Sequence, residues 1–309
     1  MLQPDALDRR IMRELESPGS FQWNIRESYA SVAKKVGVDE ETVRKRANRM
    51  REAGILKGWQ LIINPHILGR ESASIELEVK DQSNKQAALS QIELMDGIIS
   101  ILDFNGPGIQ VGVYYRSVLA LEKQIALMEA ICGNKHALLW HVAFPSNELK
   151  MKKTDWVLLS ILQKDPRKKL SEISVEANNS TRTVNRRLGL MVRDYAFFLH
   201  AVIDFKKLGG LAYRMLLYSK DPEKKAKIDE AIFAKIETIE WSYIFSKEYS
   251  MFVVYCENVS EAKEISNFVE ALDGVSKLTM DLIDDQITVQ DWIEDEIEMK
   301  ISSDSSEHS

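Results

Sequence analysis

The clearest amphipathic pattern in the chain lies at residues 39–56, DEETVRKRANRMREAGIL. Val43, Ala47 and Met50 recur at i, i+4 and i+7, which places them on one side of a helix. Gly54 offers a left-handed end to that helix, and an extended run follows. The other faces carry basic and amide side chains: Arg44, Lys45, Asn48 and Arg51. A helix, a tight turn and a strand with cations outward are typical of a recognition helix followed by a wing.

Two shorter helices precede this stretch, so the pattern predicts a three-helix unit. The first covers residues 5–15 and repeats apolar residues at spacing four, and the second covers 28–36. Between them, residues 21–26 form an insertion-like loop. After the recognition helix, residues 57–65 alternate enough to form the strand of a wing.

The pattern then changes to alternating strands and helices. Residues 72–80 alternate as a half-buried strand does, and Gly106-Pro107-Gly108 signals a hairpin. The remaining expected elements are a helix at 85–95, strands at 98–105 and 109–116, a helix at 118–132 and a strand at 136–144. The order is βαββαβ, which predicts a ferredoxin-like sandwich.

The whole order repeats in the second half of the chain. Residues 42–46 match 183–187, and Leu68-Gly69 matches Leu208-Gly209 at an offset of 140 positions. The expected fold class is α+β, a tandem repeat of a winged helix-turn-helix followed by a ferredoxin-like βαββαβ domain. The expected domains are 1–66 and 151–207 for the two winged helix-turn-helix units, 70–146 and 209–285 for the two βαββαβ domains, and 286–309 for an acidic tail.

Composition excludes several classes of protein. No run of about 18 uncharged apolar residues suits a membrane span, and residues 1–15 lack the apolar core of a signal peptide, so we expect a cytoplasmic protein. Cys132 and Cys256 lie far apart and are expected to be buried free thiols. No zinc spacing, catalytic triad, phosphate loop or paired acid and base stands out. We therefore expect no catalytic residue, no metal and no cofactor.

Charge is distributed unevenly. The net charge of the chain is −6, but residues 284–309 alone carry −8, and residues 34–57 carry +4. Affinity for phosphate depends on a local patch more than on the sum over the chain. The acidic tail contains Trp292, Ile293 and Ile297 at roughly helical spacing. We interpret it as a solubilising tail; a partner-binding helix and an autoinhibitory DNA mimic are the alternatives.

The motifs of the first half resemble those of the Lrp/AsnC regulators, the leucine-responsive and asparagine-related feast/famine proteins. They are Leu7-Asp8-x-x-Ile11-x-x-x-Leu15, Ala33-x-x-Val36-Gly37-Val38, Thr42-Val43-x-x-Arg46-x-x-x-Met50-x-x-x-Gly54-Ile55-Leu56 and Leu68-Gly69. The resemblance implies a winged helix-turn-helix joined to a βαββαβ effector domain. It also implies double-stranded DNA as a partner, a small-molecule effector bound between βαββαβ domains near the hairpins 103–109 and 246–250, and homo-oligomers.

The candidate DNA-binding residues follow from the helix-turn-helix, whose third helix enters the major groove. For base contacts we expect Thr42, Arg44, Lys45 and Asn48, and in the second copy Thr181, Arg182, Asn185 and Arg186. Arg46 and Arg49 are expected to bind phosphate or brace the fold, and Lys57 and Trp59 lie near the wing. Two copies in one chain predict a pseudo-dimer with recognition helices about 34 Å apart. The second copy has Gly189 where the first has Asn48, so the first is expected to dominate recognition.

Two other classes remain open. Fused Lrp-like pairs also occur as siroheme decarboxylases, and His66 is compatible with that enzyme, although His136 and His141 are expected to be ordinary strand residues. A protein-interaction scaffold that has lost DNA binding is the second alternative. The main hypothesis is a sequence-specific DNA-binding transcriptional regulator that is not an enzyme.

Overall fold

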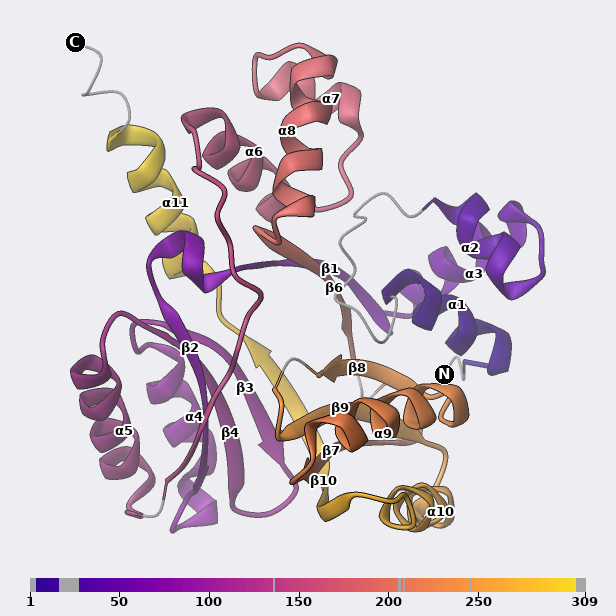
Figure 1. The fold of residues 1–309 in the computed structure, drawn as a ribbon, viewed down its shortest axis with the longest axis vertical. Coiled ribbons are helices and arrows are strands. Elements are labelled where there is room, and N and C mark those ends of the chain that lie inside the picture. The colour runs from indigo at the N-terminus through magenta and orange to yellow at the C-terminus, as the bar shows by residue number, and fades with distance from the viewer. Residues whose placement is uncertain are drawn as a thin grey trace. The chain divides into compact units, whose positions relative to one another are not determined.

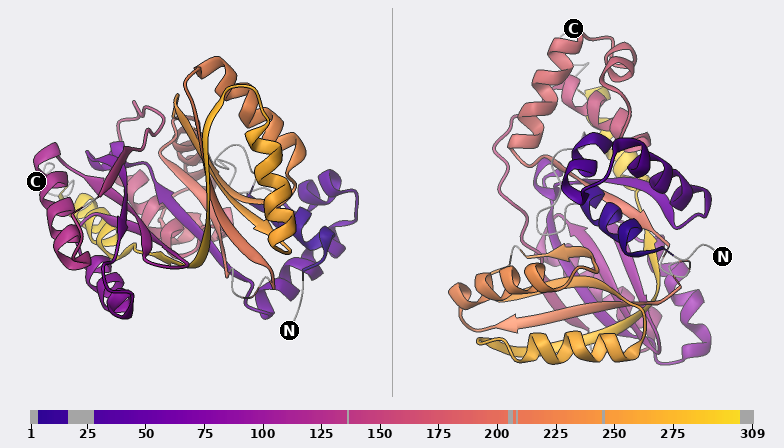
Figure 2. Two further views of the ribbon diagram at one scale, coloured as in Figure 1. Left: turned by 90° about the horizontal axis from the view of Figure 1, so that it is seen from below. Right: turned by 90° about the vertical axis from the view of Figure 1, so that its right-hand side faces the viewer.

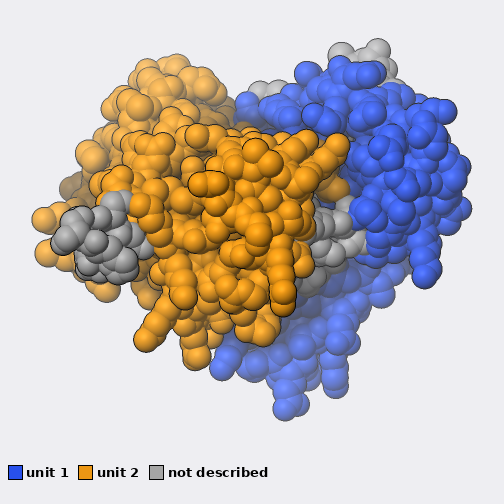
Figure 3. All heavy atoms as spheres, turned by 90° about the horizontal axis from the view of Figure 1, so that it is seen from above, with its two compact units in different colours: residues 1–58, 200–285 blue, residues 59–199, 286–309 orange. Residues whose placement is uncertain are grey.

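The computed structural model describes residues 4–16, 28–135, 137–204, 207, 209–244 and 246–303. The chain divides into two compact units that each join segments distant in sequence (Figure 3). Unit 1 comprises residues 1–58 and 200–285, and unit 2 comprises residues 59–199 and 286–309. No helix within the described ranges is long and apolar enough to cross a membrane.

Unit 1 contains the first helix-turn-helix and the second βαββαβ domain (Figure 1). The helix-turn-helix consists of α1 (Ala6–Glu16), α2 (Tyr29–Val36) and α3 (Glu40–Glu52), and β1 (Leu56–Ile63) begins after it. The βαββαβ domain consists of β7 (Leu211–Ser219), α9 (Pro222–Lys235), β8 (Ile239–Tyr243), β9 (Tyr249–Cys256), α10 (Val259–Glu270) and β10 (Val275–Thr288), whose last residues belong to unit 2.

Unit 2 contains the first βαββαβ domain, the second helix-turn-helix and the C-terminal helix (Figure 1). The short helix η1 (Pro65–Leu68) leads to β2 (Glu71–Glu78), η2 (Gln82–Asn84), α4 (Lys85–Glu93), β3 (Ile98–Phe104), β4 (Gly108–Tyr115), α5 (Val118–Cys132) and β5 (Leu138–His141). Then follow α6 (Lys153–Lys164), α7 (Leu170–Glu176), α8 (Thr181–Arg193), β6 (Phe197–Ile203), which ends in unit 1, and α11 (Asp291–Ser303).

Each βαββαβ domain is an antiparallel sheet with two helices on one face (Figures 1 and 2). The strand order is β5-β2-β4-β3 in unit 2 and β10-β7-β9-β8 in unit 1. In unit 2, inward positions of the strands pack on Leu89 of α4 and Met128 of α5. In unit 1, they pack on Ile232 of α9 and Val269 of α10. These apolar layers are the cores that the alternation of the sequence predicts.

The two third helices begin in the same way. Asp39 caps α3 by accepting a hydrogen bond from the backbone N–H of Thr42 (2.8 Å). Ser180 caps α8 by accepting one from the backbone N–H of Thr183 (3.2 Å). Both helices have 13 residues, and α8 follows α3 at an offset of 141 positions. Capping of this kind satisfies a donor that the first turn would otherwise leave unpaired.

The turns around these helices need left-handed backbone. Gly37, with φ of 78°, ends α2, and Asn178 takes the corresponding place with φ of 48°. Gly54 follows α3 with φ of 70°, whereas Tyr195 follows α8 with φ of 56°. A bulky residue in this region costs about 1–2 kcal/mol relative to glycine. The second copy therefore keeps the backbone shape of the first without its glycines.

The α+β fold, with two helix-turn-helix units and ferredoxin-like domains, is confirmed. So is the expectation of two buried free thiols, Cys132 and Cys256. The last strand of the second βαββαβ domain, β10, runs to Thr288, beyond the expected end of that domain at residue 285. The loop 21–26, His136, Leu208 and residues 304–309 lie outside the described part of the chain.

The interpretation of the C-terminal segment as a solubilising tail is wrong for residues 291–303. These residues form α11, which packs against α6 within unit 2. Ile293 and Ile297 are buried, and so is the carboxylate of Glu296. The sequence shows the apolar stripe of this helix, but the partners that neutralise Glu296 come from distant parts of the sequence.

Candidate nucleic-acid interface

An ion pair to a buried aspartate fixes each third helix to the first helix of the same helix-turn-helix. Asp8 of α1 is fully buried and contacts Nη1 of Arg46 at 3.0 Å and Nη2 of Arg49 at 2.5 Å. In the second copy, both carboxylate oxygens of Asp155 in α6 accept hydrogen bonds from Arg187 of α8, with Nε at 2.6 Å from Oδ1. A buried charge needs such a partner to be tolerated. We call these contacts the Asp–Arg braces.

Two arginines of the braces, Arg46 and Arg187, have raised pKa values, and Arg46 also contacts Asp5. The hydrogen bond from Arg46 lowers the pKa of Asp5, and the same bond raises the pKa of Arg46. The hydrogen bond to Asp155 likewise raises the pKa of Arg187. These shifts follow because each hydrogen bond favours the charged form of both partners. The contacts of Arg46 and Arg187 with the buried aspartates hold α3 and α8 in place.

The outward face of α3 carries cations that are paired with acids of the same helix. Nη2 of Arg44 lies 2.5 Å from Oε1 of Glu40, and its guanidinium lies 5.7 Å from the ring centroid of Tyr29. Nζ of Lys45 lies 3.7 Å from Oε1 of Glu41. Exposed pairs at i, i+4 are weak, typically about 0.3–0.5 kcal/mol. Arg44 and Lys45 can therefore exchange these carboxylates for another anion.

Two other residues of α3 expected to contact DNA, Asn48 and Thr42, differ in whether their side chains are available. The side chain of Asn48 is exposed and available to a groove. The hydroxyl of Thr42 donates to Oδ2 of Asp39 at 2.7 Å, so it is part of the cap. That hydrogen bond is also the main reason why the pKa of Asp39 is lowered.

The outward face of α8 has a different character. Thr181, Arg182, Asn185 and Arg186 are all exposed. The sequence of α8, TRTVNRRLGLMVR, contains no aspartate or glutamate. Its cations therefore have no acid of their own helix to pair with.

The two residues expected near the wing, Lys57 and Trp59, already contact other side chains of the protein. In unit 1, Nζ of Lys57 lies 3.6 Å from Oδ2 of Asp204. In unit 2, the guanidinium of Arg167 lies 4.7 Å from the ring centroid of Trp59. Lys57 remains half exposed, whereas one face of the indole of Trp59 is covered.

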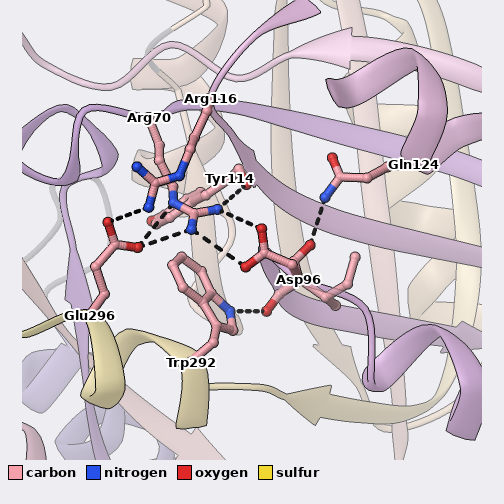
Figure 4. Close-up of polar contacts among 8 residues, drawn as sticks. Arg70, Asp96, Tyr114, Arg116, Gln124, Trp292 and Glu296 are labelled. Carbon is pink, nitrogen blue, oxygen red and sulfur yellow. Dashed lines mark hydrogen bonds and ion pairs between the residues drawn. The ribbon is translucent and has the colours of Figure 1, made fainter. Parts of the chain in front are cut away.

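Sequence reasoning missed an arginine cluster that holds the C-terminal helix (Figure 4). Nη2 of Arg70 donates to Oε2 of Glu296 at 3.0 Å, and Nη2 of Arg116 donates to Oε1 at 2.9 Å. The guanidinium of Arg70 also lies 4.3 Å from the ring centroid of Trp292, whose Nε1 donates to the carbonyl of Ile98 at 2.7 Å. These residues lie up to 226 positions apart, so no local pattern could have revealed the cluster.

Sequence reasoning also missed a pair of buried lysines. Nζ of Lys85 in α4 donates to the carbonyls of Phe104 (2.6 Å) and Gly106 (2.5 Å), at the turn between β3 and β4. Nζ of Lys225 in α9 donates to the carbonyl of Ile244 (2.5 Å), just beyond β8. The two lysines are 140 positions apart, the offset already seen at Leu68-Gly69. That offset was the signal that could have found them.

The described histidines do not form a metal site. His66 faces Glu71, with Nε2 3.5 Å from Oε2, and Nδ1 of His141 lies 3.2 Å from the hydroxyl of Tyr115. Among the described residues, no group of three or more His, Cys, Asp or Glu side chains is placed to hold a metal ion.

Known proteins resemble both halves of this chain. The AsnC-type helix-turn-helix domain matches residues 5–51, and a winged helix-turn-helix DNA-binding domain matches residues 151–194. Regulatory protein AsnC of Escherichia coli (strain K12) is 31% identical over 120 residues, which are 38% of this chain and 75% of AsnC. The chain belongs to the Lrp/AsnC family. The resemblance stated from the sequence motifs is thereby confirmed.

A second relative of this Lrp/AsnC protein is the HTH-type transcriptional regulator Ptr1 of Methanocaldococcus jannaschii. It is 30% identical over 102 residues, and the chain spans 65% of its length. Among solved structures, the siroheme decarboxylase NirDL matches 97% of this chain and 99% of its own, with a TM-score of 0.59 and 15% identity. At that identity the likeness shows the fold alone.

Proposed function

We propose that this Lrp/AsnC protein is a sequence-specific transcriptional regulator that reads duplex DNA with α3 and α8. The observation that carries the proposal is the outward polar face of each third helix, held in place by an Asp–Arg brace on its inner side. Arginine, lysine and asparagine are the side chains suited to base edges and phosphates in the major groove. The braces leave these side chains outward while fixing the helix that bears them.

The geometry supports a division of roles among the proposed contacts. Arg44, Lys45 and Asn48 of α3, and Thr181, Arg182, Asn185 and Arg186 of α8, are proposed to face the DNA. Lys57 is proposed to contact the DNA backbone. Arg46 and Arg49 are proposed to brace the fold, because both contact the buried carboxylate of Asp8. Thr42 is proposed to act through the cap of α3.

The test is an in vitro selection of bound DNA from a random pool. It would use the wild type, a K45E/N48A variant for α3 and an R182E/R186E variant for α8. We expect an enriched site for the wild type and loss of one part of that site for each variant. Lys123 on α5 provides the control, because K123E changes the same kind of charge on the βαββαβ domain.

Two further measurements decide between DNA binding and its alternatives. Affinity for the selected duplex should fall steeply with salt, because neutralised phosphates release counterions. Footprinting should give two unequal protected patches per chain, as expected for two unlike helices. Absence of any enriched site together with binding to a protein partner would favour the scaffold instead.

A small-molecule effector is proposed as a modulator of this activity, near the hairpins 103–109 and 246–250. The buried lysines Lys85 and Lys225 donate hydrogen bonds to backbone carbonyls at or next to these hairpins. These bonds hold the hairpins in a fixed shape, which favours ligand binding at their surface. Binding would be measured as a ligand-dependent shift in DNA affinity.

A siroheme decarboxylase-like enzyme is the second candidate, because the fold likeness to NirDL extends over nearly the whole chain. In this chain, His66 lies against Glu71 and His141 against Tyr115. An absorbance titration with an iron tetrapyrrole tests it directly. A saturable spectral shift without salt-dependent DNA binding would favour the enzyme over the regulator.

A further inference from the structure

The two recognition helices differ in their acids when they are compared position by position. Every acid of α3 is replaced in α8: Glu40 by Thr181, Glu41 by Arg182 and Glu52 by Arg193. Both helices keep the brace, because Arg46 of α3 corresponds to Arg187 of α8. The difference is therefore confined to the face that would meet a partner.

The acids of α3 engage its outward cations. Glu40 lies 2.5 Å from Arg44, and Glu41 lies 3.7 Å from both Arg44 and Lys45. Both acids occupy the first turn of the helix, the part that reaches furthest into a groove in this motif. A phosphate approaching this turn meets two carboxylates, and each cation must leave its carboxylate before it can bind.

The cations of α8 are not engaged in this way. Arg182 and Arg186 are exposed, and neither forms an ion pair in the described part of the chain. Arg182 also stands in the first turn of α8, where α3 has Glu41. A phosphate approaching this turn therefore meets Arg182 and no carboxylate of α8.

We infer that α8, the recognition helix of the second copy, supplies the larger share of the electrostatic affinity for the DNA backbone. This inference rests on the proposed function and concerns which helix carries it. It reverses the sequence-based expectation that the first copy dominates. That expectation weighed Gly189, which stands where the first copy has Asn48. This exchange does not change the charge of the outward face.

The experiment compares two matched double variants, R182A/R186A in α8 and R44A/K45A in α3. Each removes two exposed cations from one helix. Binding to a labelled duplex of mixed sequence is measured between about 50 and 200 mM salt. Loss of two phosphate contacts should reduce the slope of log K against log salt by about 1.8. We expect that reduction for the α8 variant and less than half of it for the α3 variant.

Two more variants complete the test. E40Q/E41Q should tighten binding severalfold at low salt, because it frees the cations of α3 and removes two negative charges that repel phosphate. K123A on α5 should leave the slope unchanged. Thermal unfolding of each variant establishes that it is folded, which is expected because all the substituted side chains are exposed.

The outcomes separate the two claims. An α3 variant that loses as much slope as the α8 variant, or an E40Q/E41Q variant without gain, would overturn this inference and leave the proposed function standing. A wild-type protein with no salt-dependent affinity for DNA would overturn both.

Discussion

Gly189 and Gly37 both have space for a side chain, but only Gly37 has a backbone conformation that other residues rarely adopt. No heavy atom lies within 4 Å of the Cβ that either Gly189 or Gly37 would carry. Gly189 lies inside α8, where the backbone suits any residue, whereas Gly37 has φ of 78°. Sterics therefore do not distinguish the two positions, and the dihedral angle alone decides the effect of a side chain.

We predict that Gly189→Ala raises the free energy of unfolding by about 0.5–1 kcal/mol, because alanine loses less backbone entropy in a helix than glycine does. Gly37→Ala is the matched control and should lower it by about 1–2 kcal/mol, since alanine is strained at positive φ. Denaturant unfolding followed by circular dichroism measures both. Two changes of the same sign would contradict the argument.

The two thiols offer a second prediction at the scale of single residues. Burial raises the pKa of Cys132 to about 11 and that of Cys256 to about 12. The thiolate is the reactive form, so a thiol of pKa 11 is only about 0.1% reactive at pH 8. We predict that a disulfide reagent labels the native protein slowly at pH 8 and faster as the pH rises, and labels the unfolded protein rapidly. Fast labelling of the folded chain at pH 7 would contradict this.

At the scale of elements, the two Asp–Arg braces look alike but differ in redundancy. Asp155 is held by Arg187, whereas Asp8 is held by both Arg46 and Arg49. A buried carboxylate that loses its last cation is left uncompensated, which is costly. One that keeps a second cation retains part of its stabilisation.

We predict that Arg187→Met destabilises the second helix-turn-helix by about 3–5 kcal/mol. Arg46→Met should cost the first helix-turn-helix clearly less, because Arg49 still contacts Asp8. Hydrogen exchange of the amides in α6–α8 and in α1–α3 measures the two effects separately. Equal losses would show that the second cation of the first brace contributes nothing.

The arginine cluster leads to a prediction for α11. Glu296→Gln removes the charge that both Arg70 and Arg116 contact, at a cost of about 1.5–3 kcal/mol. Because α11 packs against α6, hydrogen exchange should rise in both helices. Glu298→Gln, on the exposed side of α11, is the control and should change neither. Exchange that rises in α11 alone would mean that α6 does not depend on it.

At the scale of the whole molecule, unit 1 combines the first helix-turn-helix with the βαββαβ domain that is distant from it in sequence, whereas unit 2 combines the second helix-turn-helix with the βαββαβ domain that directly precedes it. In unit 1, Nη1 of Arg9 in α1 lies 3.1 Å from Oε1 of Glu257, just after β9. Its guanidinium lies 4.3 Å from the ring centroid of Tyr255. These contacts join residues that are 248 and 246 positions apart in the sequence.

We predict that Ile228→Ala in α9, a large-to-small change at a buried position, increases hydrogen exchange in α1–α3 more than in β2–β5. The reason is that α1–α3 share a unit with α9, whereas β2–β5 do not. Leu89→Ala in α4 is the reciprocal control and should loosen α6–α8 more than α1–α3. A pattern that follows sequence order instead would contradict the division into units.

The sequence by itself determined what depends on short windows of residues. Periodicities of 3.6 and 2 located the helices and strands, and an offset of 140–141 residues revealed the repeat. Family motifs identified the helix-turn-helix, and the candidate contacts on α3 and α8 followed from them. The local fold was predictable because the residues that face the core recur with the period of the helix or strand that carries them.

Only the tertiary structure decided which distant segments meet. It placed residues 1–58 with 200–285, seated Asp8 and Asp155 under the third helices, and showed α11 bound by Arg70 where the sequence suggested a solvated tail. The physical reason is common to all of these. A charge that must be buried, or an apolar stripe on a helix, indicates only that a partner is needed. Which residue becomes that partner is determined by how distant segments pack against each other.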